Sequence, residues 1–201
     1  MSIHIDGKKI TAMYWGGRKI REAWYEGQRV FSGKPVEVMP PTPNWYDAQD
    51  WLRGRLTEYG ESYQTVKEIP FEIDTGESSN LDSMFRGCSS LTTVPDMDTS
   101  QVTNMLSMFD GCSSLTTAPV MDTSQATDMR SMFRDCSSLT TVPDMDTRNV
   151  TDVSDMFRGC SSLTDGNVRL IGKHTGVSTV RMIQDSGLTR EPFYNSSGQP
   201  I

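Results

Sequence analysis

The chain has little of what several common functions require. Its 201 residues carry 19 Lys and Arg against 26 Asp and Glu, a formal net charge of -7, without clusters of basic residues. Neutralising phosphates needs such clusters, so the composition argues against a nucleic-acid partner. No run approaches the roughly 20 apolar residues of a membrane span, and the first residues lack the pattern of a secretory signal. We therefore expect neither nucleic-acid binding nor membrane insertion.

Side chains that carry chemistry are also scarce. The only histidines are His4 and His174, and no two of the four cysteines are close together in the sequence. Zinc sites use close pairs such as C-x-x-C with nearby histidines, so we expect no metal site of this kind. An enzyme needs a convergent acid, base or nucleophile, and no such set stands out. We therefore expect a protein without catalytic residues and without a cofactor.

What the sequence does have is repetition. Cys88, Cys112, Cys136 and Cys160 recur at one constant interval, and nearly the same residues surround each of them. A constant period of this length is typical of a solenoid, in which each copy is one turn that buries its apolar side only against its neighbours. Such a fold supplies a surface rather than a pocket, which favours a binding or structural protein.

We expect each copy to contain one short helix and one short parallel strand, as in leucine-rich-repeat-like α/β solenoids. The apolar residues of the second copy have the spacing of one helix face: Val102, Met105, Met108, Phe109 and Cys112. The polar residues between them would face water: Thr103, Asn104, Ser107 and Asp110. Residues 115–119 favour a short strand. The proline at its end would limit the strand to a few ladder hydrogen bonds, so we expect a narrow sheet.

Repeated side chains outside the helix face have two competing interpretations. The cysteines and methionines are predicted to fill the core, with the thiols free, although a disulfide between adjacent turns is the alternative. Asp-Thr pairs recur in four copies and are predicted to accept hydrogen bonds from backbone amides, whereas a ladder of calcium sites is the alternative. Exposed positions of the repeats are the candidate recognition surface: Thr93, Asp96, Thr117, Thr141 and Asp144.

The flanking segments divide the chain further. Residues 1–33 contain three two-residue hairpin signals and predict a small antiparallel β meander. It is too small to bury its aromatic residues, so the candidates for attachment to a partner are Trp15, Trp24 and Tyr25. Residues 34–43 favour a proline-rich linker, 44–65 a capping helix region, 66–189 the solenoid and 190–201 a C-terminal tail. The helix would begin after Asn44 and bury one apolar face: Trp45, Ala48, Trp51, Leu52, Leu56 and Tyr59.

The repeat unit of residues 102–116 and its three companions resembles the BspA-like leucine-rich repeats of bacterial surface proteins, also called the DUF285 type. The motif Val-Thr-Asn-Met, then Met-Phe, then Cys-Ser-Ser-Leu-Thr carries this resemblance. It implies adhesion or recognition. The segment 1–33, with Ile-Asp-Gly-Lys-Lys-Ile and Ala-Trp-Tyr-Glu-Gly, resembles the opening of minor tail or other virion proteins of phages that infect actinobacteria.

Together these features predict a structural protein of a phage virion. The meander would attach to other virion proteins or to copies of itself, and the solenoid would present a surface toward a host glycan or protein. A bacterial BspA-like adhesin is the first alternative, and a capsid-decoration protein is the second. A virion protein assembles in the host cytoplasm and needs no export signal. For this reason we rank the virion protein first among the candidate functions.

Overall fold

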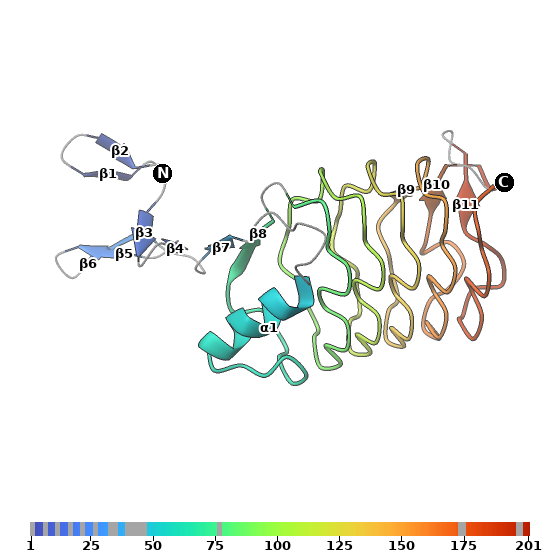
Figure 1. Ribbon diagram of the computed structural model, residues 1–201, viewed down its shortest axis with the longest axis horizontal. Helices are drawn as coiled ribbons and strands as arrows, with labels where there is room; N and C mark the ends of the chain where they lie inside the picture. The colour runs from blue at the N-terminus through green and yellow to red at the C-terminus, as the bar shows by residue number, and fades with distance from the viewer. Residues whose placement is uncertain are drawn as a thin grey trace.

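The computed structural model describes the backbone of strands β1 to β7 within residues 1–47, and then residues 48–75, 78–172, 176–195 and 199–201 in full. In Figure 1, residues from about 80 onward form successive coils that lie side by side between helix α1 and the C-terminal strands. Isolated parallel bridges join equivalent residues of neighbouring coils: Asn80, Asn104, Asp128, Asp152 and Ser178. One repeat of the sequence therefore corresponds to one coil.

The N-terminal strands form three hairpins rather than one meander. Each antiparallel pair has its own short strands: β1 (Ile3–Ile5) with β2 (Lys8–Ile10), β3 (Met13–Trp15) with β4 (Arg18–Ile20), and β5 (Ala23–Tyr25) with β6 (Gln28–Phe31). Among these described strands, β2 does not pair with β3, nor β4 with β5. The second edge of β4 is taken by β7, so the hairpin signals fix each local turn but not the lateral pairing.

Strand β7 (Val36–Val38) lies within the segment predicted to be only a linker. It pairs antiparallel with β4 and parallel with β8 (Glu72–Asp74), which gives a four-stranded sheet in the order β3, β4, β7, β8. Proline frequency alone predicted a spacer here, but Val36 and Val38 provide a strand between two prolines. This pairing joins the N-terminal part of the chain to the start of the repeats.

Helix α1 (Ala48–Glu58) covers the first coil, and its apolar face is buried as its spacing predicts. Four of the predicted positions are buried in the core: Ala48, Trp51, Leu52 and Leu56. Tyr59 packs against the core beside Phe71, at a ring distance of 5.0 Å. The predicted cap Asn44 and the predicted face residue Trp45 lie outside the described residues.

The predicted helix of each repeat is wrong. Within the described repeats the chain instead makes consecutive turns, with i to i-3 hydrogen bonds such as those from the N–H groups of Met108 and Cys112. Two residues per coil adopt the left-handed conformation, Ser107 (φ 53°) and Gly111 (φ 76°) in the second copy. A left-handed residue breaks the α-helical hydrogen-bond pattern and turns its N–H sideways, toward the next coil. Apolar residues spaced by three fit such turns as well as they fit a helix.

The predicted strand is also shorter and displaced. At residues 115–119 only one bridge forms in the described chain, between Thr117 and Thr141. The parallel sheet lies just beyond the proline, where β9 (Met145–Asp146), β10 (Leu170–Ile171) and β11 (Phe193–Tyr194) pair in the order β9, β10, β11. Proline has no N–H to donate to a ladder, so pairing resumes only after it.

The core is a set of side-chain stacks that run across the coils. Phe85, Phe109, Phe133 and Phe157 stack face to face with ring distances of 5.3, 5.3 and 5.9 Å. All four cysteines are free and fully buried, as predicted. Three thiols also donate hydrogen bonds to the carbonyl of a phenylalanine in the preceding coil, for example Cys112 to Phe85 at 3.1 Å. The core therefore couples each coil to the one before it.

Candidate recognition surface

A continuous surface follows the same segment of three successive coils, from the threonines before the proline to the aspartate after it. We call it the Thr-Asp surface, and all of its members are exposed: Thr93, Asp96, Asp98, Thr117, Val120, Asp122, Thr141 and Asp144. It contains all five residues predicted as surface candidates. The structure brings Thr117 and Thr141 together, with 3.5 Å between their hydroxyl oxygens.

Val120 is the member of this surface that the sequence did not single out. Because Thr117 pairs with Thr141, Val120 occupies the position of Asp144 in the neighbouring coil, and Asp96 the same position one coil earlier. Its side chain is 75% exposed, the largest value among the exposed large hydrophobic residues described. An apolar group thus lies between two carboxylates. The departure from aspartate in one copy is the signal that could have identified it.

Asp98 and Asp122 turn the backbone at the far end of this surface. Their carboxylates accept hydrogen bonds from the amides of Ser100 and Ser124, at 3.0 and 2.9 Å. These bonds hold the pKa of both carboxyl groups below its usual value, whereas the neighbouring carboxylates, Asp146 and Asp98, act in the opposite direction on Asp122. The prediction that the aspartates accept hydrogen bonds from backbone amides is therefore confirmed at Asp98 and Asp122, although the turn does not lead into a helix.

The threonine that follows each of these aspartates has a different role from the predicted one. Its hydroxyl donates to a carbonyl of the next coil, as Thr99 does to Asp122 at 2.9 Å and Thr123 to Asp146 at 3.0 Å. The hydroxyl of Thr147 is buried without a hydrogen-bond partner among the described residues, and a Cβ at Gly172 of the next coil would clash with it. Thr99 and Thr123 therefore tie coils together and do not cap the local turn.

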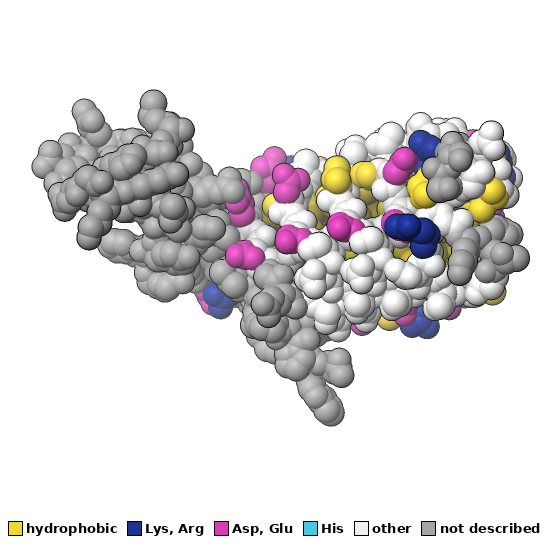
Figure 2. All heavy atoms as spheres, turned by 90° about the horizontal axis from the view of Figure 1, so that it is seen from above, with side chains coloured by type: hydrophobic (Ala, Val, Ile, Leu, Met, Phe, Trp, Pro, Cys, Tyr) yellow, Lys and Arg dark blue, Asp and Glu magenta, His cyan; other side chains and the backbone are white. Residues whose placement is uncertain are grey.

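The charge of the surface is compensated unevenly along the stack. Toward the C-terminal side, Asp144 pairs with Arg169 at 3.2 Å and Asp146 with Arg148 at 2.5 Å. No ion pair is described for Asp96, Asp98 or Asp122, within the part of the chain described. Figure 2 shows this gradient: acidic side chains follow one another across the coils, apolar atoms show between them, and basic side chains lie toward the C-terminal end.

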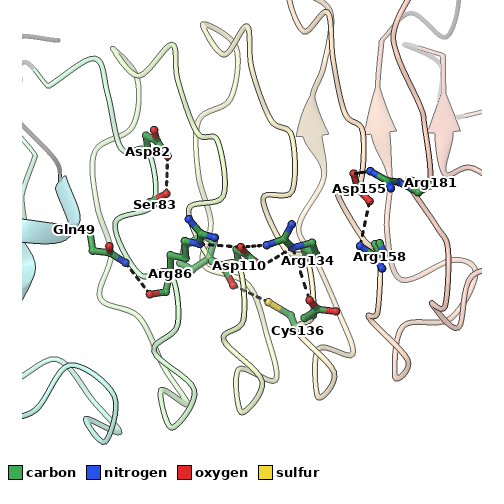
Figure 3. A network of polar contacts seen from close by, with 12 residues as sticks. Gln49, Asp82, Ser83, Arg86, Asp110, Arg134, Cys136, Asp155, Arg158 and Arg181 are labelled. Carbon is green, nitrogen blue, oxygen red and sulfur yellow. Dashed lines mark hydrogen bonds and ion pairs between the residues drawn. The ribbon is translucent and has the colours of Figure 1, made fainter. Parts of the chain in front are cut away.

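A second polar ladder runs along a different part of the coils and has a buried carboxylate at its centre. Asp110 lies between Arg86, 3.1 Å away, and Arg134, which approaches to 2.6 Å (Figure 3). Only 6% of the Asp110 side chain is exposed, although the spacing of the repeat predicts a place on the solvent face for Asp110 and Ser107. A carboxylate enclosed by two guanidinium groups has its charge satisfied within the fold. We therefore assign this ladder to stability.

The predicted attachment residues have strand backbones. Trp15 lies in β3, and Trp24 and Tyr25 lie in β5; the surroundings of their side chains lie outside the described residues. Across the described residues, no three His, Cys, Asp or Glu side chains are grouped so that they could hold a metal ion. The described helices likewise include none that is long and apolar enough to cross a membrane.

Comparison with known proteins identifies the repeats at the level of the family. The family model described as "Mycoplasma protein of unknown function, DUF285" matches residues 63–185. No curated protein and no solved structure matches the chain. The matched region extends from Tyr63, whose hydroxyl accepts a hydrogen bond from Gln49 of α1, to Asp185 in the last coil, and so covers more than half of the chain. The resemblance of the repeats to the DUF285 type is confirmed, and the chain belongs to the DUF285 family.

Proposed function

We propose that this protein recognises a partner by binding, in the manner of a BspA-like surface protein, and that the Thr-Asp surface makes the contact. In this proposal the repeats are a solenoid scaffold without catalytic activity. The observation that carries it is one exposed position that departs from the repeat. The buried Phe, Cys and Leu positions are identical in four copies, whereas one exposed position reads Asp96, Val120 and Asp144 in turn.

This contrast has a physical basis. Stacked coils must repeat the same core side chains to keep their contacts in register, so the inner positions have little freedom. The exposed positions have no such requirement, and their chemistry can follow a ligand. Hydroxyls, carboxylates and one apolar group on a rigid surface fit a hydroxyl-rich or amine-bearing partner, such as a cell-surface glycan or protein.

Binding through the Thr-Asp surface can be tested with two exposed substitutions and a matched control. The purified full chain, fluorescently labelled, is titrated onto host cells. We expect Thr117→Arg and Val120→Arg each to weaken binding at least about tenfold, since one buried contact is worth about 1.4 kcal/mol or more at an interface. Thr65→Arg, at an exposed position outside this surface, should leave binding unchanged. Equal binding by all variants would contradict the proposal.

We further propose that the surface on which this protein is displayed is a phage virion. The support is the resemblance of residues 1–33 to the opening of virion proteins, together with three hairpins that precede the repeats. In this proposal the hairpins attach the chain to other virion proteins and the coils face the host. The family match favours a second candidate, a BspA-like protein on a bacterial surface.

Deletion of residues 1–33 separates these candidates. We expect the truncated chain to keep the circular dichroism spectrum of its coils and to be lost from purified particles. Immunogold labelling of intact particles then places the full chain on the tail, or on the head as a capsid-decoration protein would be. Labelling of bacterial cells instead of particles would establish the adhesin. Unfolding of the truncated chain would show that the hairpins belong to the cap of the first coil.

A further inference from the structure

Backbone N–H groups join each coil to the next one along the chain. In the second copy, four N–H groups donate to carbonyls of the following coil at 3.0, 2.9, 2.9 and 2.7 Å, those of Met105, Ser107, Phe109 and Gly111. The same alternate positions donate in every earlier and later coil up to Asp155, Phe157 and Gly159. Each coil therefore presents a row of donors on its C-terminal side, and the next coil supplies the acceptors.

In the last coil, no described residue is stacked on this row. The equivalent residues are Thr179, Arg181, Ile183 and Asp185, and none of their four N–H groups donates a hydrogen bond in the described chain. Arg181 and Asp185 still have the left-handed φ of 54° and 58° that directs these groups outward. In Figure 1 this coil forms the C-terminal end of the stack, and no further coil follows it. We call these four residues the open edge.

The rest of this end of the molecule is closed by the chain itself. The upper part of the last coil continues into β11, where Tyr194 bridges Pro200 and the N–H of Ile201 donates to Phe193. The C-terminal residues thus cover β11. The open edge is the part of the last coil that lacks such a cover.

Two copies of the stack cannot close this edge by stacking end to end. Two open edges would present donors to donors. The opposite end has acceptors, but α1 and the segment after it already occupy them: Gln49 donates to the carbonyl of Arg86 and Tyr63 to that of Met84, both at 2.9 Å. An extended polypeptide segment can supply such a row, because its backbone carbonyls pair with the donors of an exposed edge.

The side chains at the open edge indicate what that segment carries. Ile183 has the position of the stacked phenylalanines and is only partly buried, and Val180 is 59% exposed. Arg181 and Arg158 share one carboxylate, that of Asp155, at 2.8 and 3.8 Å. An apolar side chain would cover Ile183, and an acidic one would balance the second guanidinium.

We propose that the open edge is a docking site for an extended polypeptide segment of a partner protein, with an acidic residue over Arg181 and an apolar residue over Ile183. The segment adds to the stack as a further half-coil and accepts hydrogen bonds from the four N–H groups. None of these residues belongs to the Thr-Asp surface. Ligand binding at the Thr-Asp surface and docking at the open edge are therefore separate events.

The repeats themselves supply a probe for this site. A synthetic peptide with the sequence of residues 150–160, with serine in place of Cys160, carries Asp155 and Phe157 at the required spacing. The same segment accepts hydrogen bonds from the coil before it, for example from Phe133 N–H to Met156 O at 3.0 Å. Added to the full chain, the peptide should slow hydrogen exchange at the amides of Thr179, Arg181, Ile183 and Asp185, as followed residue by residue by NMR.

Matched variants decide whether the effect belongs to the open edge. Arg181→Gly suits the left-handed backbone and should weaken peptide binding about tenfold, the value of one such charge pair. Ile183→Lys should abolish it, whereas Val120→Lys, at an exposed valine of an inner coil, should not change it. Absence of protection at millimolar peptide, or protection in all variants alike, would overturn the proposal. Protection that rises with protein concentration without peptide would assign the edge to a second copy instead.

Discussion

The guanidinium of Arg134 donates to both carboxylate oxygens of Asp110, from Nε to Oδ1 at 2.9 Å and from Nη2 to Oδ2 at 2.6 Å. The two residues hold the same position in successive copies, and Arg86 holds it one coil earlier. Identical charges at this position would repel each other across the stack. Because the second copy carries aspartate where its two neighbours carry arginine, this repeated position links three coils.

Asp110→Ala should lower the free energy of unfolding by about 2 kcal/mol, because it removes the two charge-assisted hydrogen bonds that Arg134 donates to a buried carboxylate. Urea denaturation followed by circular dichroism measures this change. The matched control is Asp128→Ala, which removes a partly exposed carboxylate paired with Arg130 within one coil. That substitution should cost less than about 1 kcal/mol. Equal losses for the two variants would show that Asp110 is no more than a surface ion pair.

Phe109→Ala should cost about 3–5 kcal/mol, since the ring is fully buried between Phe85 and Phe133. In a stack where each coil contacts only its neighbours, this loss should also uncouple the two sides. Hydrogen exchange should then become faster at residues 102–112 than at residues 150–160. Val120→Ala, at an exposed position, should change stability by less than about 0.5 kcal/mol. A loss below about 1 kcal/mol for Phe109→Ala would contradict the stacked core.

The four thiols should react with iodoacetamide only when the protein unfolds. Burial raises the pKa of Cys88 and Cys160 to about 12, and that of Cys112 and Cys136 well above its usual value, so little thiolate forms near pH 8. Mass spectrometry should find four labels on the denatured, unreduced chain and almost none on the native one. Fewer than four labels after denaturation would reveal a disulfide.

Stability should fall as the pH rises above about 9. The folded-state pKa of Cys88 and Cys160 lies near 12, while an unfolded thiol has its usual pKa near 8.5. Between these values the unfolded chain loses protons that the folded chain keeps, so alkali favours unfolding. Each such thiol contributes up to about 1.4 kcal/mol per pH unit. Urea midpoints at pH 8, 9 and 10 measure the decline, which Cys160→Ala should make shallower. A flat profile would contradict the buried thiols.

Burial in the repeats was predictable at most apolar positions. Apolar residues that return with the same spacing in every copy have to face the interior of a stack, whatever the local backbone, because only neighbouring copies can cover them. This reasoning located Met105, Phe109 and Cys112 in the core and the apolar face of α1 against its end. It failed for Asp110, whose burial depends on charges in two other copies.

The backbone conformation between those apolar positions was not predictable from their spacing. Helices and consecutive turns both bury residues three apart, and the sequence favoured the helix. The left-handed residues decide the outcome, and most of them are not glycine: Ser83, Ser107, Ser131 and Asp155 hold one such position. No local propensity places serine there. The conformation is stabilised by N–H groups that donate to the next coil, a gain that exists only once the coil is stacked.

The sequence by itself determined the repeat interval, the inward positions and the family, because each of these depends on identities that recur at fixed separations. Only the tertiary structure decided how each coil pairs with the next, which carboxylates are enclosed and which are exposed, and that the N–H groups of Thr179, Arg181, Ile183 and Asp185 have no acceptor within the described chain. Such features depend on contacts between copies and on where the stack stops. The identity of a residue does not reveal whether its backbone forms a hydrogen bond across coils, since every residue except proline has an N–H that can donate.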